Sequence, residues 1–233
     1  MKKLLLILLC LPFIGFGQQT YVPDDNFEAY LEANGMGDGI QLNDSINYWA
    51  IEMLMILDVS NQNISDLTGI QDFIALRELN CGSNQLSSLD LSQNIYLDEL
   101  ECSFNLITYL DLSANTELTK IYIDDNQLSY LDLRNGNNSN VIDFYASYNP
   151  NLTCINVDNV AWSNSNWLVS SYQIDPQHYF STNCPTTSIQ EHSTNKELLK
   201  VTDLLGRETK GTKNKPLLYL YDDGTVEKRI VIE

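Results

Sequence analysis

The sequence predicts a β-rich solenoid of about five coils with short parallel strands, and two observations support this fold class. Residues 76–94 follow the spacing Leu-x-x-Leu-x-Cys-x-x-Asn-x-Leu-x-x-Leu-Asp-Leu-x-x-Asn, and residues 97–115 repeat it 21 residues later with one isoleucine for leucine. A fixed period of this size is typical of stacked units that bury their apolar faces only against their neighbours. Insertions such as residues 135–140 fall at turns, so the strand positions stay constant.

Residues 1–17 have the pattern of a secretory signal peptide. Two lysines precede an apolar run, and small residues follow before the expected cleavage after Gly17. The run has about 13 residues whereas a spanning helix needs roughly 20, so we expect no integral membrane span. Cys10 follows Leu9 rather than a small residue, which argues against a lipoprotein. Export permits disulfide bonds.

Residues 18–53 are expected to form an N-terminal helical cap. Pro23 and the two aspartates after it suit the start of a helix, and Phe27, Tyr30 and Leu31 then share one face. Such a cap covers the core that an open end of a solenoid would expose.

The repeats occupy residues 54–157. The first coil is irregular, regular coils begin at Leu76 and Leu97, and further coils begin at Leu118 and Val141. This pattern resembles the leucine-rich repeat family, and more narrowly its bacterial subclass with a 21-residue unit. The resemblance implies one parallel strand near the Leu-x-Cys positions and a second strand at Leu-Asp-Leu on the opposite side.

Side chains alternate along a strand, so Leu79 and Cys81 should point inward and their neighbours outward. Cys81 and Cys102 occupy equivalent positions and are expected to be buried thiols. Four asparagines should stack at one corner and bond backbone groups that the turn leaves unpaired. They are Asn84, Asn105, Asn126 and Asn149.

The outward side chains should form columns across the strands. In chain order these columns are Glu78, Glu99, Lys120 and Asp143; Asn80, Glu101, Tyr122 and Tyr145; Gly82, Ser103, Asp124 and Ser147; and Ser83, Phe104, Asp125 and Tyr148. Exposed aromatic rings supply rigid contact area and the acids reject anions, so we expect a concave surface that binds an extracellular protein or polysaccharide. The candidate ligand residues are Glu99, Glu101, Phe104, Lys120, Tyr122, Asp124, Asp125, Asp143, Tyr145 and Tyr148. The alternative is a solvated face on a structural spacer with no ligand.

The charge excludes several classes of partner. The net charge is −18, and between residues 18 and 188 the only cations are Arg77, Lys120 and Arg134. Nucleic acids and anionic membrane surfaces need basic patches. From residue 189 onward acids and bases balance, which indicates a domain boundary near 184–188.

No cofactor is expected, and two histidines are too few for a His-based metal site. A calcium site at Asp38 and Asp44, or along the Asp90, Asp111 and Asp132 ladder, is an alternative. Stacked strands place that ladder's carboxylates about 4.8 Å apart, repelling by about 1 kcal/mol in water. Solvation, the Ser92 and Ser113 hydroxyls, Arg134 or a cation could offset this repulsion.

Residues 158–188 are expected to form a C-terminal cap. The stretch from Asn151-Leu152-Thr153-Cys154-Ile155 to Cys184 resembles the closing segment of secreted repeat proteins of the Bacteroidetes. The resemblance implies a Cys154–Cys184 disulfide, which would stabilise the fold by roughly 3–4 kcal/mol. Trp162 and Trp167 would cover the last coil, or alternatively form a sugar-stacking site.

Residues 189–233 resemble the type A sorting domain of the type IX secretion system. Three motifs, at 199–208, 217–225 and 228–233, occur in the order typical of that domain, and their β-rich runs surround a hairpin turn. The resemblance implies a small all-β domain, type IX secretion machinery as a partner, and release or display at the outer cell surface. An ordinary terminal hairpin is the alternative. The candidate sorting residues are Asp203, Leu205, Gly206, Arg207, Tyr219, Tyr221, Asp223, Gly224 and Lys228.

Catalysis is not expected, although paired carboxylates such as Glu99 and Glu101 suit glycan hydrolysis in principle. The sequence shows no cleft or environment that would raise one carboxyl pKa, and His178 and His192 both lie outside the repeats. A non-catalytic binding module is the leading prediction.

Overall fold

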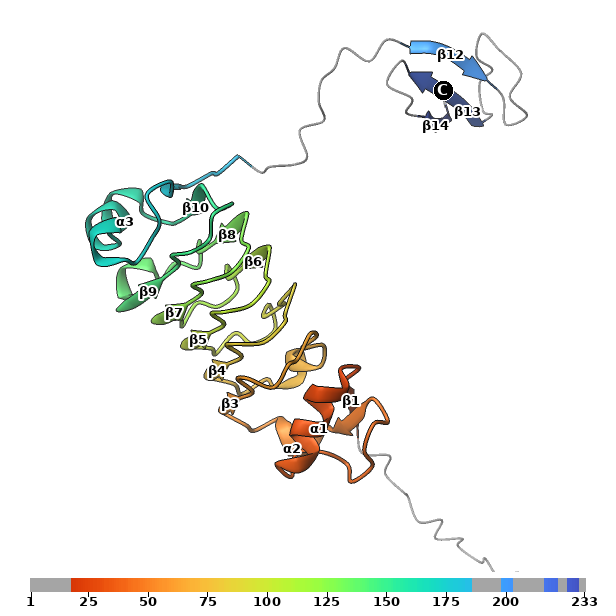
Figure 1. The fold of residues 1–233 in the computed structure, drawn as a ribbon, viewed down its shortest axis with the longest axis vertical. Helices are drawn as coiled ribbons and strands as arrows, with labels where there is room; N and C mark the ends of the chain where they lie inside the picture. Colours follow the sequence, from red (N-terminus) through yellow and green to blue (C-terminus); the bar gives the residue numbers. More distant parts are fainter. Residues whose placement is uncertain (1–17, 186–197, 203–215, 222–225, 231–233) are drawn as a thin grey trace, which may run out of the picture. The chain divides into compact units, whose positions relative to one another are not determined.

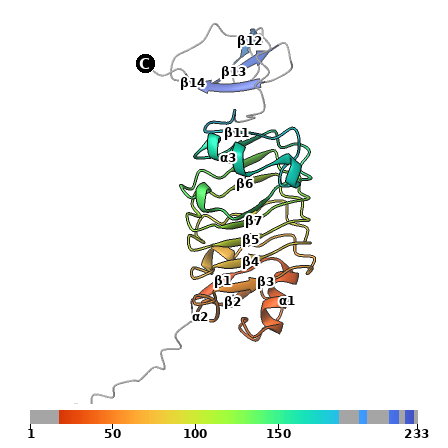
Figure 2. The ribbon, with the colours of Figure 1, turned by 90° about the vertical axis from the view of Figure 1, so that its left-hand side faces the viewer.

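The computed structural model describes residues 18–185, 198–202, 216–221 and 226–230. The chain divides into two compact units, residues 1–185 and 186–233, which are described separately. The expected signal peptide lies outside the described residues. In the first unit, two ladders of short strands run along opposite sides of a stack of coils (Figures 1 and 2).

One ladder is a five-stranded parallel sheet of β3 (Ile56–Asp58), β4 (Glu78–Asn80), β5 (Glu99–Glu101), β7 (Lys120–Tyr122) and β9 (Asp143–Tyr145). The central residue of each strand is in direct register with the next and is buried. These residues are Leu57, Leu79, Leu100, Ile121 and Phe144. The predicted stacking of coils is therefore confirmed.

The other ladder is a four-stranded parallel sheet of β6 (Tyr109–Asp111), β8 (Tyr130–Asp132), β10 (Cys154–Asn156) and β11 (Tyr179–Ser181), with β6 at one edge. It confirms a second strand at Leu-Asp-Leu from β6 onward. The prediction was wrong for residues 89–91, which form no strand. In the preceding coil, the 3-10 helix η1 (Ile70–Asp72) follows Leu67. That coil therefore has no strand with which residues 89–91 could pair.

The corner asparagines do what their spacing predicts. The Nδ2 of Asn105 donates to the carbonyl oxygens of Cys81 at 3.0 Å and Cys102 at 3.1 Å, while its Oδ1 accepts the Leu86 amide at 3.0 Å. The other three repeat this arrangement, so each side chain joins two coils. A second buried row at the opposite corner bonds carbonyls of the preceding coil and was not predicted. It consists of Asn94, Asn115 and Asn135.

The aspartate ladder is in register where strands exist, with Asp111 opposite Asp132. The carboxylates of Asp90 and Asp111 each accept a backbone amide two residues on, at 2.9 Å. Burial acts to raise the Asp132 pKa, but hydrogen bonds from Arg134 and Tyr130 leave it lowered. Hydrogen bonds from turn amides to Asp90 and Asp111, and from Arg134 to Asp132, therefore stabilise the carboxylates of this ladder.

The N-terminal segment contains α1 (Asp25–Ala33) and α2 (Tyr48–Ile51), with β1 (Gln19–Tyr21) and β2 (Ser45–Asn47) paired antiparallel. A helix therefore starts where the sequence predicted one, whereas the strand pair was not predicted. Phe27 is buried, and its ring centroid lies 6.3 Å from that of Phe73 in the first coil.

The C-terminal segment of this unit contains η2 (Asn138–Asn140), α3 (Val160–Asn166) and η3 (Val169–Ser171). Cys154 and Cys184 form the expected disulfide, with their Cα atoms 5.7 Å apart. Trp167 is buried, its ring centroid 4.3 Å from that of Phe144, and Trp162 meets it edge-on. The sugar-stacking alternative is wrong for Trp167, because its ring belongs to the core, whereas Trp162 is half-buried against that core.

The second unit contributes one antiparallel sheet, in the order β12 (Leu198–Thr202), β13 (Pro216–Tyr221), β14 (Val226–Ile230). The last described strand, β14, begins two residues before the third expected motif at 228–233. Tyr219 and Tyr221 lie on β13 and Lys228 on β14. The remaining sorting residues lie outside the described residues: Asp203, Leu205, Gly206, Arg207, Asp223 and Gly224.

Candidate functional site

The outward side of the five-stranded sheet, hereafter the five-stranded face, carries the predicted columns in register. Glu78, Glu99, Lys120 and Asp143 lie directly opposite one another on successive strands. The Lys120 Nζ lies 2.6 Å from Glu99 Oε2, and this hydrogen bond raises the lysine pKa. The cation of the column is thus already paired, and the strands on either side of this pair, β4 and β9, carry Glu78 and Asp143.

The second column holds a stacked pair of aromatic rings. Tyr122 and Tyr145 lie with ring centroids 5.7 Å apart and planes 8° from parallel. The Tyr122 hydroxyl donates to Asp143 Oδ2 at 3.1 Å, and burial followed by this bond raises its pKa. We expected both rings to be exposed, but the structure shows them half-buried. The stacking of the two rings and the hydrogen bond to Asp143 on β9 fix the orientation of Tyr122.

Glu101 lies at the centre of this face, in a groove of about 300 Å³ that Ile56 and Tyr122 also line. Burial raises the Glu101 pKa, although its Oε1 accepts the Ser103 amide at 2.8 Å. The expectation that no environment here raises a carboxyl pKa was therefore wrong. The sequence could not reveal it because the burial comes from neighbouring coils.

The third predicted column lies on the same side of the sheet as Glu101, but most of it is covered by neighbouring side chains. Ser103 and Ser147 are buried, and a Cβ on Gly82 would lie only 3.1 Å from Glu101 Oε1. Asp124 accepts the amide and hydroxyl of Ser147 at 3.0 and 2.8 Å, and burial raises its pKa. Gly82, Ser103 and Asp124 line a hollow beside Glu101 and Phe104, so this column borders the five-stranded face without projecting from it.

The fourth column occupies the turn itself, in the left-handed backbone region. Its φ angles are 56° at Ser83, 57° at Phe104, 51° at Asp125 and 58° at Tyr148. Bulky residues rarely adopt this conformation because Cβ approaches the carbonyl oxygen. Phe104 and Tyr148 nevertheless lie here with 60% and 64% of their surface exposed. Neither gains burial that would offset the strain.

Large apolar side chains that sequence reasoning missed lie at the N-terminal end of the unit. Ile56 is 59% exposed on β3, the edge strand of the five-stranded sheet. Trp49 on α2 and Met53, one helical turn later, are more exposed still. Their apolar character was visible, but nothing in the spacing indicated that these positions face solvent.

The described residues contain no group of three or more His, Cys, Asp or Glu placed to hold a metal ion. Asp38 of the calcium alternative instead accepts hydrogen bonds from the Asn43 side chain at 3.0 Å and the Ile40 amide at 2.9 Å. Cys81 and Cys102 are buried free thiols, as predicted, and burial raises both pKa values. In the same described residues, no helix is long and apolar enough to cross a membrane.

No family model matches the chain. Internalin J of Listeria monocytogenes serotype 4b (strain F2365) is 38% identical over 74 residues, which are 32% of this chain and 8% of that protein. A solved structure described as the functional domain of InlJ from Listeria monocytogenes, which includes a cysteine ladder, is 33% identical, with a TM-score of 0.49. The match covers 60% of this chain and 33% of that one. The chain thus spans a third or less of the length of these two relatives.

An internalin, inlF, from the same Listeria strain is 19% identical with a TM-score of 0.44, over 69% of this chain and 56% of that one. The leucine-rich repeat is confirmed by the sequence match to Internalin J together with the register of the parallel strands. This chain is similar to internalins.

Proposed function

We propose that this chain is an extracellular binding module that holds a protein partner of basic and apolar character against the five-stranded face. The observation that carries the proposal is the pair of exposed aromatic side chains, Phe104 and Tyr148, in left-handed backbone positions. The turn imposes this backbone conformation on every coil, so bulky aromatic residues at a position that Ser83 and Asp125 also occupy carry extra strain, and such strain is typical of functional surfaces. Aromatic side chains are also the commonest energetic anchors of protein interfaces.

The negative charge of residues 18–185 favours a basic partner. Residues 18–185 contain 23 carboxylates and three Lys or Arg, of which Lys120 is paired with Glu99 and Arg134 with Asp132. Such a surface raises the encounter rate with cations and repels anions. A partner rich in lysine or arginine therefore fits Glu78, Glu101 and Asp143.

Exposed apolar side chains favour protein over polysaccharide at this face. Ile56 lines the same groove as Glu101, and Trp49 and Met53 are exposed within the preceding segment. Exposed aliphatic and Met side chains suit an apolar protein patch better than sugar hydroxyls. The similarity to Internalin J also supports a protein-binding role.

The proposal includes export and capping. Residues 18–53 and 158–188 cap the two ends of the solenoid, residues 1–17 direct secretion, and residues 189–233 direct sorting through the type IX system to the outer surface. The sorting part is tested by deleting residues 189–233 in a type IX-competent bacterium. Loss of surface protein is expected, and unchanged display would contradict it.

The binding part is tested with a random 12-residue peptide library displayed on phage and selected on the purified protein. We expect enriched peptides to combine Arg or Lys with apolar residues. Phe104→Gly with Tyr148→Gly should weaken the best peptide roughly tenfold or more, since each anchor contributes about 1 kcal/mol or more. Ser83→Gly is the matched control, because it occupies the same left-handed position without an aromatic ring.

The same variants separate binding from a spacer role. Glycine relieves the left-handed strain, so the double variant should lose affinity without losing stability. If no peptide is enriched, or if affinity is unchanged in the double variant, the chain is a spacer and the proposal is wrong.

A further inference from the structure

The two ladders differ at one place, between the coil of residues 87–92 and the coil of residues 108–114. Strand β6 is the edge of its sheet because residues 89–91 form no strand. Among the described residues, no backbone hydrogen bond joins these two segments, although Leu106 donates to Leu86 just before them at 2.8 Å. The coil-to-coil ladder is therefore interrupted on this side.

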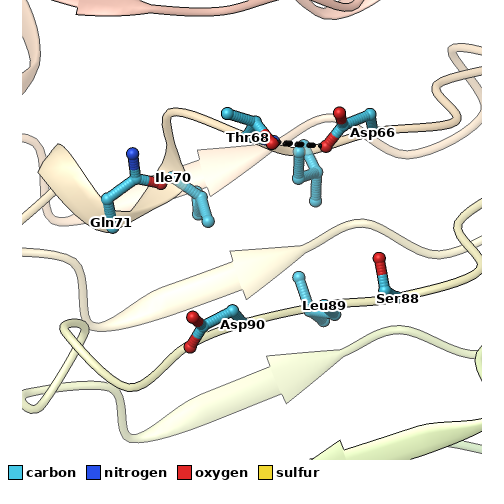
Figure 3. Close-up of a pocket in the computed structure, with 8 residues that line it drawn as sticks. Asp66, Thr68, Ile70, Gln71, Ser88, Leu89 and Asp90 are labelled. Carbon is cyan, nitrogen blue, oxygen red and sulfur yellow. Dashed lines mark hydrogen bonds between the residues drawn. The ribbon is translucent and has the colours of Figure 1, made fainter. Parts of the chain in front are cut away.

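A groove of about 490 Å³ lies at the interruption, within the size range of ligand pockets. It is lined by Ser88, Leu89, Asp90, Thr108, Tyr109 and Asp111, among others. A second hollow of about 170 Å³ shares Ser88, Leu89 and Asp90 and continues the groove to the preceding coil. Figure 3 shows this continuation, with Asp66, Thr68 and Gln71 on one coil and Ser88, Leu89 and Asp90 on the next.

A column of side chains explains why the groove exists. Tyr109 and Tyr130 occupy equivalent positions 21 residues apart and stack with ring centroids 4.5 Å apart and planes 4° from parallel. The equivalent position in the preceding coil is Ser88, which is too small to continue the stack. One face of the Tyr109 ring therefore meets Tyr130, and the other face is turned toward the groove. Tyr109 is 53% exposed.

The polar groups around this ring are mostly hydroxyls and acceptors. Leu112 donates to the Asp132 carbonyl on β8, so the main-chain groups of Asp111 point the opposite way, toward the groove. The carboxylates of Asp90 and Asp111 each use one oxygen to accept a turn amide, which leaves the other oxygen for a ligand. Among the residues that the structure describes, none that lines the groove is Lys or Arg.

We propose that this groove binds a neutral, linear oligosaccharide, with a sugar ring stacked on the open face of Tyr109. A flat aromatic wall contacts the apolar face of a sugar ring, while hydroxyls and carboxylates pair with its hydroxyl groups. The two carboxylates repel anionic sugars. The groove crosses successive coils, which suits a chain of sugar units rather than one. This site is independent of the proposed protein-binding face.

The test is an array of neutral and anionic glycans probed with the purified protein, followed by calorimetry on the best neutral hit. We expect binding to a neutral oligosaccharide and none to polygalacturonate. Ser88→Tyr fills the hollow by extending the existing stack, so it should reduce affinity roughly tenfold or more while the protein stays folded. Tyr109→Ala should do the same, and Tyr109→Phe should retain binding.

Tyr145→Ala on the five-stranded face is the control and should not change glycan affinity. The proposal is overturned if no neutral glycan binds, or if Ser88→Tyr leaves the affinity unchanged. It is also overturned if a hexa-arginine peptide binds the groove and Ser88→Tyr abolishes that binding instead, because the groove would then recognise cationic side chains.

Discussion

Single side chains set the register of neighbouring coils, and Asn105 shows how. Its amide bridges the carbonyl of Cys81 in the preceding coil to that of Cys102 in its own, and its Oδ1 accepts a third backbone group. The sequence predicted this role because an asparagine at a fixed offset from a buried strand can satisfy turn groups. The second row, at Asn94 and Asn115, has the same spacing but was given no role.

Asn105→Ala should lower the free energy of unfolding by about 3 kcal/mol, because several buried backbone groups lose their partner at once. Urea denaturation measures this change. Gln127→Ala is a suitable control, since that side chain is exposed at the same corner and its loss should cost less than about 0.5 kcal/mol. Equal effects of the two substitutions would mean that the asparagine row does not hold the coils.

A second residue-scale prediction concerns His178. Burial lowers its pKa below 6.5, although nearby Asp175 acts in the opposite direction, and its Nδ1 accepts the Asp175 amide at 3.3 Å. The unfolded state therefore binds the proton more readily. Stability from the neutral ring is complete above pH 6.5 and is lost as the pH falls through the lower folded-state pKa.

Thermal melts at pH 7.5 and 5.5 should show a larger loss for the native protein than for His178→Gln. Other carboxylates titrate in both proteins, so the difference between the two isolates the histidine. A His178 imidazole that titrates by NMR at or above 6.5 would contradict this prediction.

At the scale of elements, Asp24 joins helix α1 to the first coil. Its Oδ1 accepts the amides of Asn26 and Phe27 at 3.0 Å, and its Oδ2 accepts the amide and hydroxyl of Ser65 at 2.8 Å. The sequence predicted the helix start from local signals. The contact with Ser65 was not predictable because it depends on how the helix packs.

Asp24→Ala should destabilise the protein by about 1–3 kcal/mol, since it removes a helix cap and leaves first-coil amides unpaired. Asp25→Ala, an exposed neighbour in the first helical turn, should cost only a few tenths of a kcal/mol. Chemical denaturation of both variants provides the measurement. A similar cost for both would show that Asp24 acts only through helix charge.

The disulfide is the other link between elements. It ties β10 to the end of the segment that carries β11, its neighbour in the four-stranded sheet. Replacing Cys154 and Cys184 together by alanine should reduce stability by roughly 3–4 kcal/mol in the chain-entropy model. Reductant should lower the melting temperature of the native protein and leave the double variant unchanged. A native melting temperature that does not respond to reductant would contradict this.

At the scale of the whole molecule, periodicity predicted the solenoid, its inward residues and the order of the five-stranded sheet. Departures from periodicity were not predictable. The strand missing at residues 89–91 arises from the path of the preceding coil, and this gap together with the small Ser88 side chain leaves the groove. The burial of Ser103 and Ser147 in the third column depends on neighbouring coils, and the left-handed angles at Phe104 and Tyr148 follow from the turn geometry.

The two proposed sites should also differ in how strongly binding depends on salt. Peptide binding at the acidic five-stranded face should weaken as salt rises from about 50 to 500 mM, because screening shortens the range of these charges. Neutral glycan binding at the Tyr109 groove should change little. Calorimetry at two salt concentrations checks both, and an equal response would show that charge does not distinguish them.

The most direct test of the binding account is hydrogen–deuterium exchange of the native protein with and without its best selected peptide. Peptide binding at the five-stranded face should slow exchange at β5, β7, β9 and the turns carrying Phe104 and Tyr148, with no change at β6 and β8. Protection confined to β6 and β8, or no protection in either sheet, would contradict the claim that the five-stranded face binds the partner.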